Sequence, residues 1–246
     1  MDPAQAQPTL ETVLVEGLRG RCGGTFARPN GPAWKSGVVV LGEPDDRYLT
    51  TVCTKLASAG HAAIALQLDL APLTEQLFLT PSAFSYLAEC TAAVTAALEL
   101  VRAKAATPPP RWGAVGVGAG GLVSLTAGYR CQIGASVSFY AEGPVRLRAN
   151  LRQIFDRPKP HAAPTLCLVG AFEEVLPADL AAIGTQFRHF GMRETMVIYP
   201  RRKTGFCHPS SPTYREEDAR DAWGRLLRAL ECAPRQRYRF VSKAHS

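Results

Sequence analysis

The sequence predicts a single α/β domain in which helices cover both faces of a mostly parallel, doubly wound sheet. Three observations lead to this prediction. Apolar strand-like runs alternate with segments of helical periodicity along most of the chain. The run Val38-Val39-Val40-Leu41 is continuously apolar, as in a parallel strand that is buried on both faces. The chain has 246 residues, of which 46% are hydrophobic, and this is enough for one sizeable core.

The first half of the chain contains three strand–helix units. Asp45 or Asp46 can cap the first helix, and Gly60 is a plausible end for it. The three prolines at 108–110 end the second helix. The first unit is a strand at 38–41 and a helix through Leu49, Val52, Cys53 and Leu56. The second is a strand at 62–68 and a long helix after Pro81, with Leu87, Cys90, Val94, Leu98 and Val101 on one face. The third is a strand at 112–117 and a helix at 122–129.

The second half continues the alternation. The expected elements are strands at 135–140 and 165–169, a helix at 177–190, a strand at 195–199 and a final helix at 216–230. We expect residues 25–232 to form the domain, preceded at 1–24 by a tail and first strand region and followed at 233–246 by a basic tail. Residues 142–164 show little apolar periodicity and are interpreted as a basic excursion over the strand ends.

Cysteine usage and the terminal sequence indicate the compartment. The seven cysteines are scattered and odd in number, and no Cys-x-x-Cys or histidine-rich pairing suggests a metal site. Free thiols in a reducing intracellular compartment are expected, either cytoplasmic or organellar, for example mitochondrial. No apolar run approaches the roughly 20 residues of a membrane span. The first residues do not resemble a secretory signal or a transit peptide.

The formal net charge of +7 is unevenly distributed. Basic residues gather in three groups: Arg146, Arg148, Arg152, Arg157 and Lys159; Arg201, Arg202 and Lys203; and the tail with Arg235, Arg237, Arg239 and Lys243. Solvated surface is the preferred interpretation, and an anionic partner is the alternative. No nucleic-acid recognition motif accompanies the charge.

A glycine-rich run, Val115-Gly116-Val117-Gly118-Ala119-Gly120-Gly121, follows the strand at 112–117. It has the pattern of a nucleophile elbow, a sharp strand-to-helix turn, with Gly118 in the place of the Ser or Cys nucleophile. The same glycines match a dinucleotide fingerprint, Gly116-x-Gly118-x-x-Gly121, with Glu142 as the candidate ribose ligand. The nucleotide-binding interpretation is the weaker one, because the motif comes after two earlier strand–helix units.

From residue 25 to residue 230 the chain resembles the dienelactone hydrolase family of α/β-hydrolases. The matching pieces occur in the family's order: Phe26-Ala27-Arg28-Pro29, Gly37 to Leu41, Ala59-Gly60-His61 to Leu70, Gly116 to Gly121, Phe139-Tyr140, Leu168-Val169-Gly170, and Gly205-Phe206 with the later stretch from Tyr214 to Trp223. The resemblance implies the α/β-hydrolase fold. It also implies a Cys-His-Asp triad that attacks a lactone or ester.

The resemblance places the three triad roles on unusual residues. The nucleophile position is Gly118, the histidine position is Thr204, and the acid position is Glu173 or the adjacent Glu174. Glycine has no side chain with which to attack, and a threonine hydroxyl has no pKa near neutral pH at which it could serve as the base and acid. Glycine can also adopt the positive φ of an elbow without strain.

The expected function is therefore that of a pseudoenzyme, an α/β-hydrolase scaffold that acts as a structural or interaction subunit with other proteins and needs no cofactor. The alternative is an ester or lactone hydrolase, or a non-covalent lactone isomerase or cyclase, using Glu43, Glu173, Cys207 or His208. The family carries a glutamate at the Glu43 position, which contacts the resting thiol. Cys207 and His208 are expected to be a surface loop pair, because adjacent side chains point in different directions.

Overall fold

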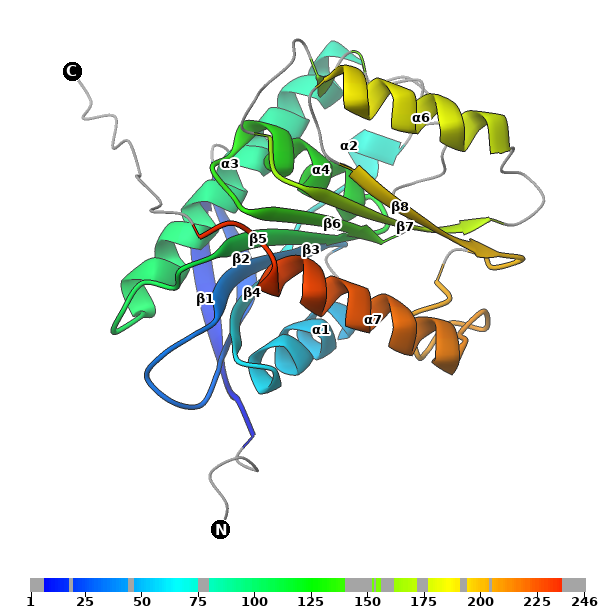
Figure 1. The fold of residues 1–246 in the computed structure, drawn as a ribbon. Helices are drawn as coiled ribbons and strands as arrows, with labels where there is room; N and C mark the ends of the chain where they lie inside the picture. The colour runs from blue at the N-terminus through cyan, green and yellow to red at the C-terminus, as the bar shows by residue number, and fades with distance from the viewer. Residues whose placement is uncertain are drawn as a thin grey trace.

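The computed structural model describes residues 7–17, 20–43, 47–74, 80–139, 152, 154, 155, 162–171, 177–190, 194–203 and 205–235. These residues form one sheet with helices on both of its faces (Figure 1). The prediction of a single doubly wound α/β domain is confirmed.

The sheet has eight strands in the order β1-β2-β4-β3-β5-β6-β7-β8. Strands β3 to β8 run parallel, whereas β1 and β2 form an antiparallel hairpin whose second strand pairs with β4. The region expected to precede the domain thus contributes β1 and the start of β2 to the same sheet. The strand bounds are Thr9–Gly17, Gly20–Arg28, Ser36–Gly42, His61–Gln67, Trp112–Val117, Ala135–Phe139, Thr165–Ala171 and Glu194–Pro200 for β1 to β8.

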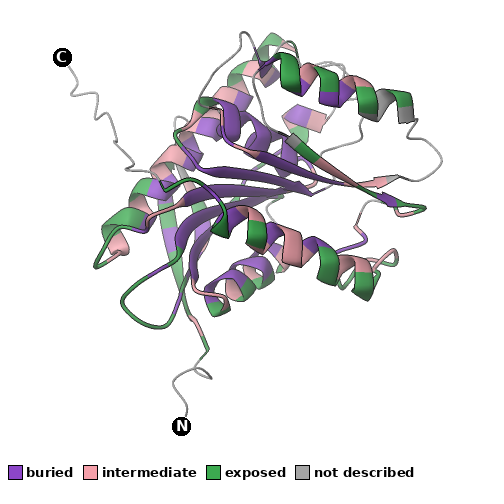
Figure 2. Ribbon diagram, viewed as in Figure 1, coloured by how far each residue is buried: buried purple, intermediate pink, exposed green. Residues whose placement is uncertain are grey.

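The helices divide between the two faces. Helices α1 (Arg47–Ser58) and α7 (Glu216–Glu231) cover one face, and α3 (Pro81–Lys104), α4 (Gly120–Arg130) and α6 (Pro177–His189) cover the other (Figure 1). The short α2 (Ala71–Thr74) packs beside α3. The central strands are buried, and the outward faces of the helices are exposed (Figure 2). This is the arrangement that the continuously apolar strands predict.

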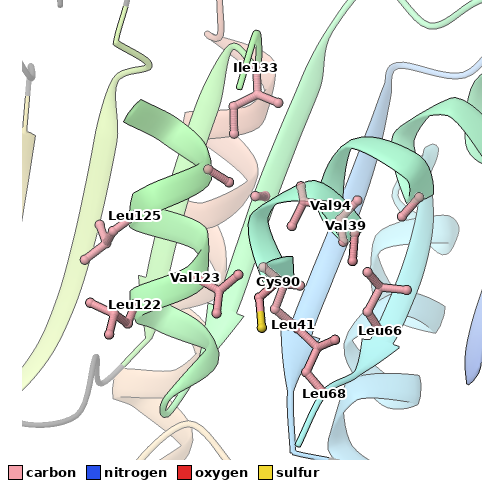
Figure 3. Packing of buried hydrophobic residues seen from close by; sticks show 14 of the residues in the cluster. Val39, Leu41, Leu66, Leu68, Cys90, Val94, Leu122, Val123, Leu125 and Ile133 are labelled. Carbon is pink, nitrogen blue, oxygen red and sulfur yellow. The ribbon is translucent and has the colours of Figure 1, made fainter. Parts of the chain in front are cut away.

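Helix α3 illustrates how local sequence sets an element. The side chain of Thr80 caps its start by accepting a hydrogen bond from the Ala83 N–H at 3.2 Å, and Pro81 occupies the first turn. Cys90 and Val94 pack toward β3, β4 and α4 (Figure 3). By length and composition α3 could also cross a membrane. In this fold its apolar face is part of the core.

At the amino-terminal ends of the parallel strands, a buried polar contact joins β3 to β4. Ser36 Oγ and His61 Nδ1 lie 2.7 Å apart, and both side chains are buried. Glu231, at the end of α7, accepts a hydrogen bond from Lys35 Nζ at 3.1 Å and lies 3.8 Å from His61 Nε2. Burial, together with the positive charge of Lys35, lowers the pKa of His61 to about 4. His61 is therefore neutral at pH 7, and its contact with Glu231 is no ion pair there.

Candidate functional site

The turn between β5 and α4 lies at the carboxyl end of the parallel sheet, where open α/β folds bind their ligands. Gly118 is the first residue after β5, and its N–H donates to the Phe139 carbonyl at the end of β6, at 3.0 Å. The Gly118 carbonyl accepts from the Gly121 N–H at 2.9 Å, which closes the turn into α4. The strand–turn–helix geometry predicted for residues 115–121 is present.

Gly118 has the backbone conformation of an elbow nucleophile. Its φ of 56° lies in the left-handed region, which residues with a Cβ adopt only at a cost. A Cβ built at Gly118 would have no atom of the described residues within 4 Å, apart from its chain neighbours. A side chain at this position would therefore project away from the described part of the fold, as a nucleophile does in this motif. The position is shaped for a reactive side chain and carries none.

The neighbouring Gly120 is held by close backbone packing. A Cβ there would lie 2.3 Å from the Leu41 carbonyl oxygen, too close for any side chain. A Cβ on Gly116 would likewise collide with the Gly120 carbonyl oxygen, at 2.0 Å. These contacts press the elbow against the end of β3. Glu43, the exposed residue that follows β3, therefore lies at the same corner of the sheet as the elbow.

The start of α4 retains a donor that this motif uses in catalysis. Ala119 precedes the helix, and no side chain caps it. In a nucleophile elbow, the N–H of the residue after the nucleophile helps to bind a substrate oxyanion. That residue is Ala119, and its N–H makes no hydrogen bond to any of the residues that the structure describes. Carbonyl or carboxylate binding can thus persist without the nucleophile.

The loop after β8 carries Cys207 and His208, and it places their side chains in different surroundings. Cys207 is buried in the core between the sheet and the helices α1 and α7, so the surface position expected for this residue was wrong. The apolar Phe206 next to it is fully buried and draws this part of the loop inward. His208 is half-buried and packs on Tyr48, with 4.4 Å between the ring centroids. The two adjacent side chains thus lie in different surroundings, one in the core and one against Tyr48.

Hydrogen bonding determines which nitrogen of His208 carries its proton. Nδ1 accepts from the Ser210 backbone N–H at 3.1 Å, and a backbone N–H can only donate. The neutral ring therefore holds its proton on Nε2, and that nitrogen is a donor. In this conformation His208 cannot take a proton on Nδ1, as a general base would, without losing its bond to Ser210.

Tyr48 is a site residue that no motif in the sequence indicates. Its hydroxyl donates to the Cys207 carbonyl at 2.9 Å, and its ring supports His208. Tyr48 lies in the first turn of α1, 159 residues before its hydrogen-bond partner. No local sequence pattern reveals such a contact. The only available signal was an aromatic residue in the first turn after the first core strand.

Several predicted residues lie outside the described part of the chain: Glu173, Glu174, Thr204, Glu142, Arg146, Arg148 and the tail from residue 236. Among the described basic residues, Arg152 and Arg201 are exposed, and Arg202 forms an ion pair with Asp218 of α7. Within the described ranges, no cluster of three or more His, Cys, Asp or Glu side chains could hold a metal ion.

Comparisons with known proteins agree with this geometry. A protein of Methylorubrum extorquens named as a carboxymethylenebutenolidase is 26% identical over 199 residues. The matched region spans 73% of this chain and 65% of the length of that relative. The dienelactone hydrolase of Anabaena variabilis has the same fold, with a TM-score of 0.65 and 20% identity over 94% of this chain and all of that one.

A second solved structure extends the likeness. It is P91, a dienelactone hydrolase-like promiscuous phosphotriesterase from metagenomic libraries, with a TM-score of 0.69 and 18% identity over 93% of this chain and 99% of that one. At these identities the two structures show the fold alone. The sequence profile of the dienelactone hydrolase family matches residues 23–233, which include both the elbow and the loop after β8. This chain belongs to the dienelactone hydrolase family.

Proposed function

We propose that this chain binds an ester or a lactone at the carboxyl edge of the sheet, over Gly118, and that it forms no acyl-enzyme. The observation that carries the proposal is Gly118 itself, which has a φ of 56° and, among the described residues, no neighbouring atom within 4 Å of the position where a nucleophilic side chain would begin. Two of the relatives named above are called a carboxymethylenebutenolidase and a dienelactone hydrolase, and these names support the choice of ligand.

The chain's own residues support binding without covalent attack. The thiol nearest in sequence to the missing histidine position, that of Cys207, is in the core. The Nδ1 of His208 is occupied by the Ser210 N–H, and Thr204 cannot take the histidine's role. The Ala119 N–H remains suited to a carbonyl oxygen. These features stabilise a bound carbonyl group and supply no nucleophile.

A matched pair of substitutions tests the binding site. Gly118→Ala and Gly118→Leu both impose a side chain on a left-handed residue, but only leucine fills the space above the elbow. We expect 2(5H)-furanone and phenyl acetate to bind the wild type and the alanine variant, as measured by saturation-transfer NMR, and to lose binding in the leucine variant. Equal binding by all three proteins would place the ligand elsewhere and refute the proposal.

A second candidate function, a subunit of a protein assembly, rests on a separate observation. The large hydrophobic side chains exposed among the described residues are Leu10, Leu14 and Ile198, and all three lie on β1 or β8, the outer strands of the sheet. Outer strands with exposed apolar residues are typical sites of association. Light scattering of the wild type and of Leu14→Lys tests this role. A wild-type monomer with no copurifying protein would refute it.

A further inference from the structure

A groove lies between α7 and the amino-terminal ends of β7 and β8, at the opposite end of the parallel strands from the elbow. Its volume is about 420 Å³, in the lower part of the range of small-molecule sites. The walls are mainly apolar, with contributions from Pro164, Leu166, Ala229 and Ala233. The proposed ester or lactone site uses none of these residues.

The wall formed by α7 is fixed in place. The Cys232 N–H donates to the Arg228 carbonyl at 2.8 Å, and Arg111 Nε donates to the Ala233 carbonyl at 3.0 Å. The Thr165 hydroxyl, on the strand side, is engaged with the Ala163 carbonyl at 3.2 Å. These bonds hold the groove in shape before any ligand arrives, which lowers the ordering cost of binding.

The polar side chains of the groove carry positive charge. Arg225 donates to Asp221 at 2.7 Å, and Asp221 also accepts from the Tyr199 hydroxyl at 2.8 Å. Asp221 thus neutralises one arginine of the groove wall. Arg228, one turn along the helix, is exposed and forms no ion pair with any described residue. Among the described residues, the groove wall therefore has two arginines and the single carboxylate of Asp221 beside them.

These features define the ligand. We infer that the groove binds a small amphipathic monocarboxylate, with its apolar body against Leu166 and Ala229 and its carboxylate on Arg228. One carboxylate on the ligand pairs with Arg228. A dianion would bring a second negative charge, for which the described groove wall has only Arg225, already bonded to Asp221. The chain's own tail is a poor occupant, because Arg235, Arg237, Arg239 and Lys243 would meet Arg228 without an acid between them.

Cys232 provides a reporter, because its exposed thiol lines the groove. The experiment measures the rate at which iodoacetamide alkylates Cys232, by peptide mass spectrometry, with octanoate, octanol or octylamine present. We expect octanoate to slow alkylation saturably and the two analogues without a carboxylate to have little effect. The half-buried thiols Cys22 and Cys131 serve as internal references that octanoate leaves unchanged.

Two variants on α7 complete the test. Arg228→Gln should weaken protection by octanoate at least about tenfold, because it removes a charge-assisted hydrogen bond. Arg220→Gln is the matched control, since Arg220 pairs with Glu216 and does not line the groove. Both positions are exposed, and thermal unfolding verifies that both variants are folded. Equal protection by octanoate and octanol, or full protection in Arg228→Gln, would overturn the inference, whatever the outcome at Gly118.

Discussion

The backbone of Gly120 packs directly against that of Leu41, so that a Cβ on Gly120 would lie 2.3 Å from the Leu41 carbonyl oxygen. This contact joins the start of α4 to the end of β3 and fixes the corner at which the elbow and Glu43 meet. It holds whether or not the elbow carries a nucleophile. The contact therefore holds the turn without any contribution from a side chain at position 118.

The first prediction concerns this contact. Gly120→Ala should lower the free energy of unfolding by about 1–3 kcal/mol, because backbone atoms must move apart to admit the methyl group. Gly23→Ala is the control, since a Cβ on Gly23 meets no atom of the described residues within 4 Å. Urea unfolding of both variants checks the difference. If the two substitutions lowered the free energy of unfolding equally, the close approach of Gly120 to Leu41 would not be what makes glycine necessary at position 120.

The second prediction concerns Gly118. Gly118→Cys should destabilise the fold by about 1–2 kcal/mol, because a side chain disfavours positive φ while the space around it is open. Gly118→Asn should cost less, since asparagine tolerates the left-handed region better. Thermal and urea unfolding measure both variants. An unchanged or raised melting temperature for the cysteine variant would contradict the claim that glycine avoids backbone strain at position 118.

The third prediction concerns Tyr48. Tyr48→Phe removes the hydrogen bond to the Cys207 carbonyl and should cost about 1 kcal/mol, while the ring contact with His208 remains. Tyr48→Ala removes both contacts and should also loosen residues 205–210. Hydrogen–deuterium exchange of this loop distinguishes the two variants. If the alanine variant exchanged no faster than the phenylalanine variant, Tyr48 would not support the loop.

The fourth prediction is a pH dependence that arises from His61. Its pKa is lowered to about 4 by burial and by the charge of Lys35, so the folded state stays unprotonated where the unfolded chain, with a pKa near 6.5, binds a proton. The stability contributed by neutral His61 is complete above about pH 6.5. It is lost as the pH falls from there to about 4.

Urea unfolding between pH 7.5 and pH 4.5 measures this dependence. The variant His61→Gln, which can still bond Ser36, should show a shallower loss of stability over that range. The quantity compared is the change in the free energy of unfolding with pH. The comparison is therefore valid even if the variant is less stable than the wild type at every pH. Parallel slopes for the two proteins would exclude His61 as the source.

The fold was largely predictable because its central strands are continuously apolar and its helices are amphipathic. The region at 9–17 was harder to assign. In β1, Val13 and Val15 are buried while Leu14 between them is exposed, so three apolar residues in succession conceal the alternation of an outer strand. β1 pairs with β2, and the sequence of β2 does not show the alternation of apolar and polar residues that marks a strand.

The site was predictable only where backbone conformation follows from residue type. The run Gly116 to Gly121 specified the turn, including the positive φ at Gly118. The hydrogen bond on the Cys207 carbonyl comes from Tyr48 of α1, and the proton position on His208 depends on the Ser210 N–H of the folded loop. The groove beside Arg228 likewise brings together β7, β8 and α7, which are separate in sequence.

The most direct test of the central claim is the burst phase of 4-nitrophenyl acetate hydrolysis, followed by stopped flow in a Cys232→Ser background that removes an exposed thiol. The chain should release no stoichiometric burst of 4-nitrophenolate, because Gly118 cannot be acylated. Combining Gly118→Cys with Thr204→His should introduce a burst that approaches one equivalent per chain. A burst of that size in the protein without these two substitutions would contradict the claim that it forms no acyl-enzyme.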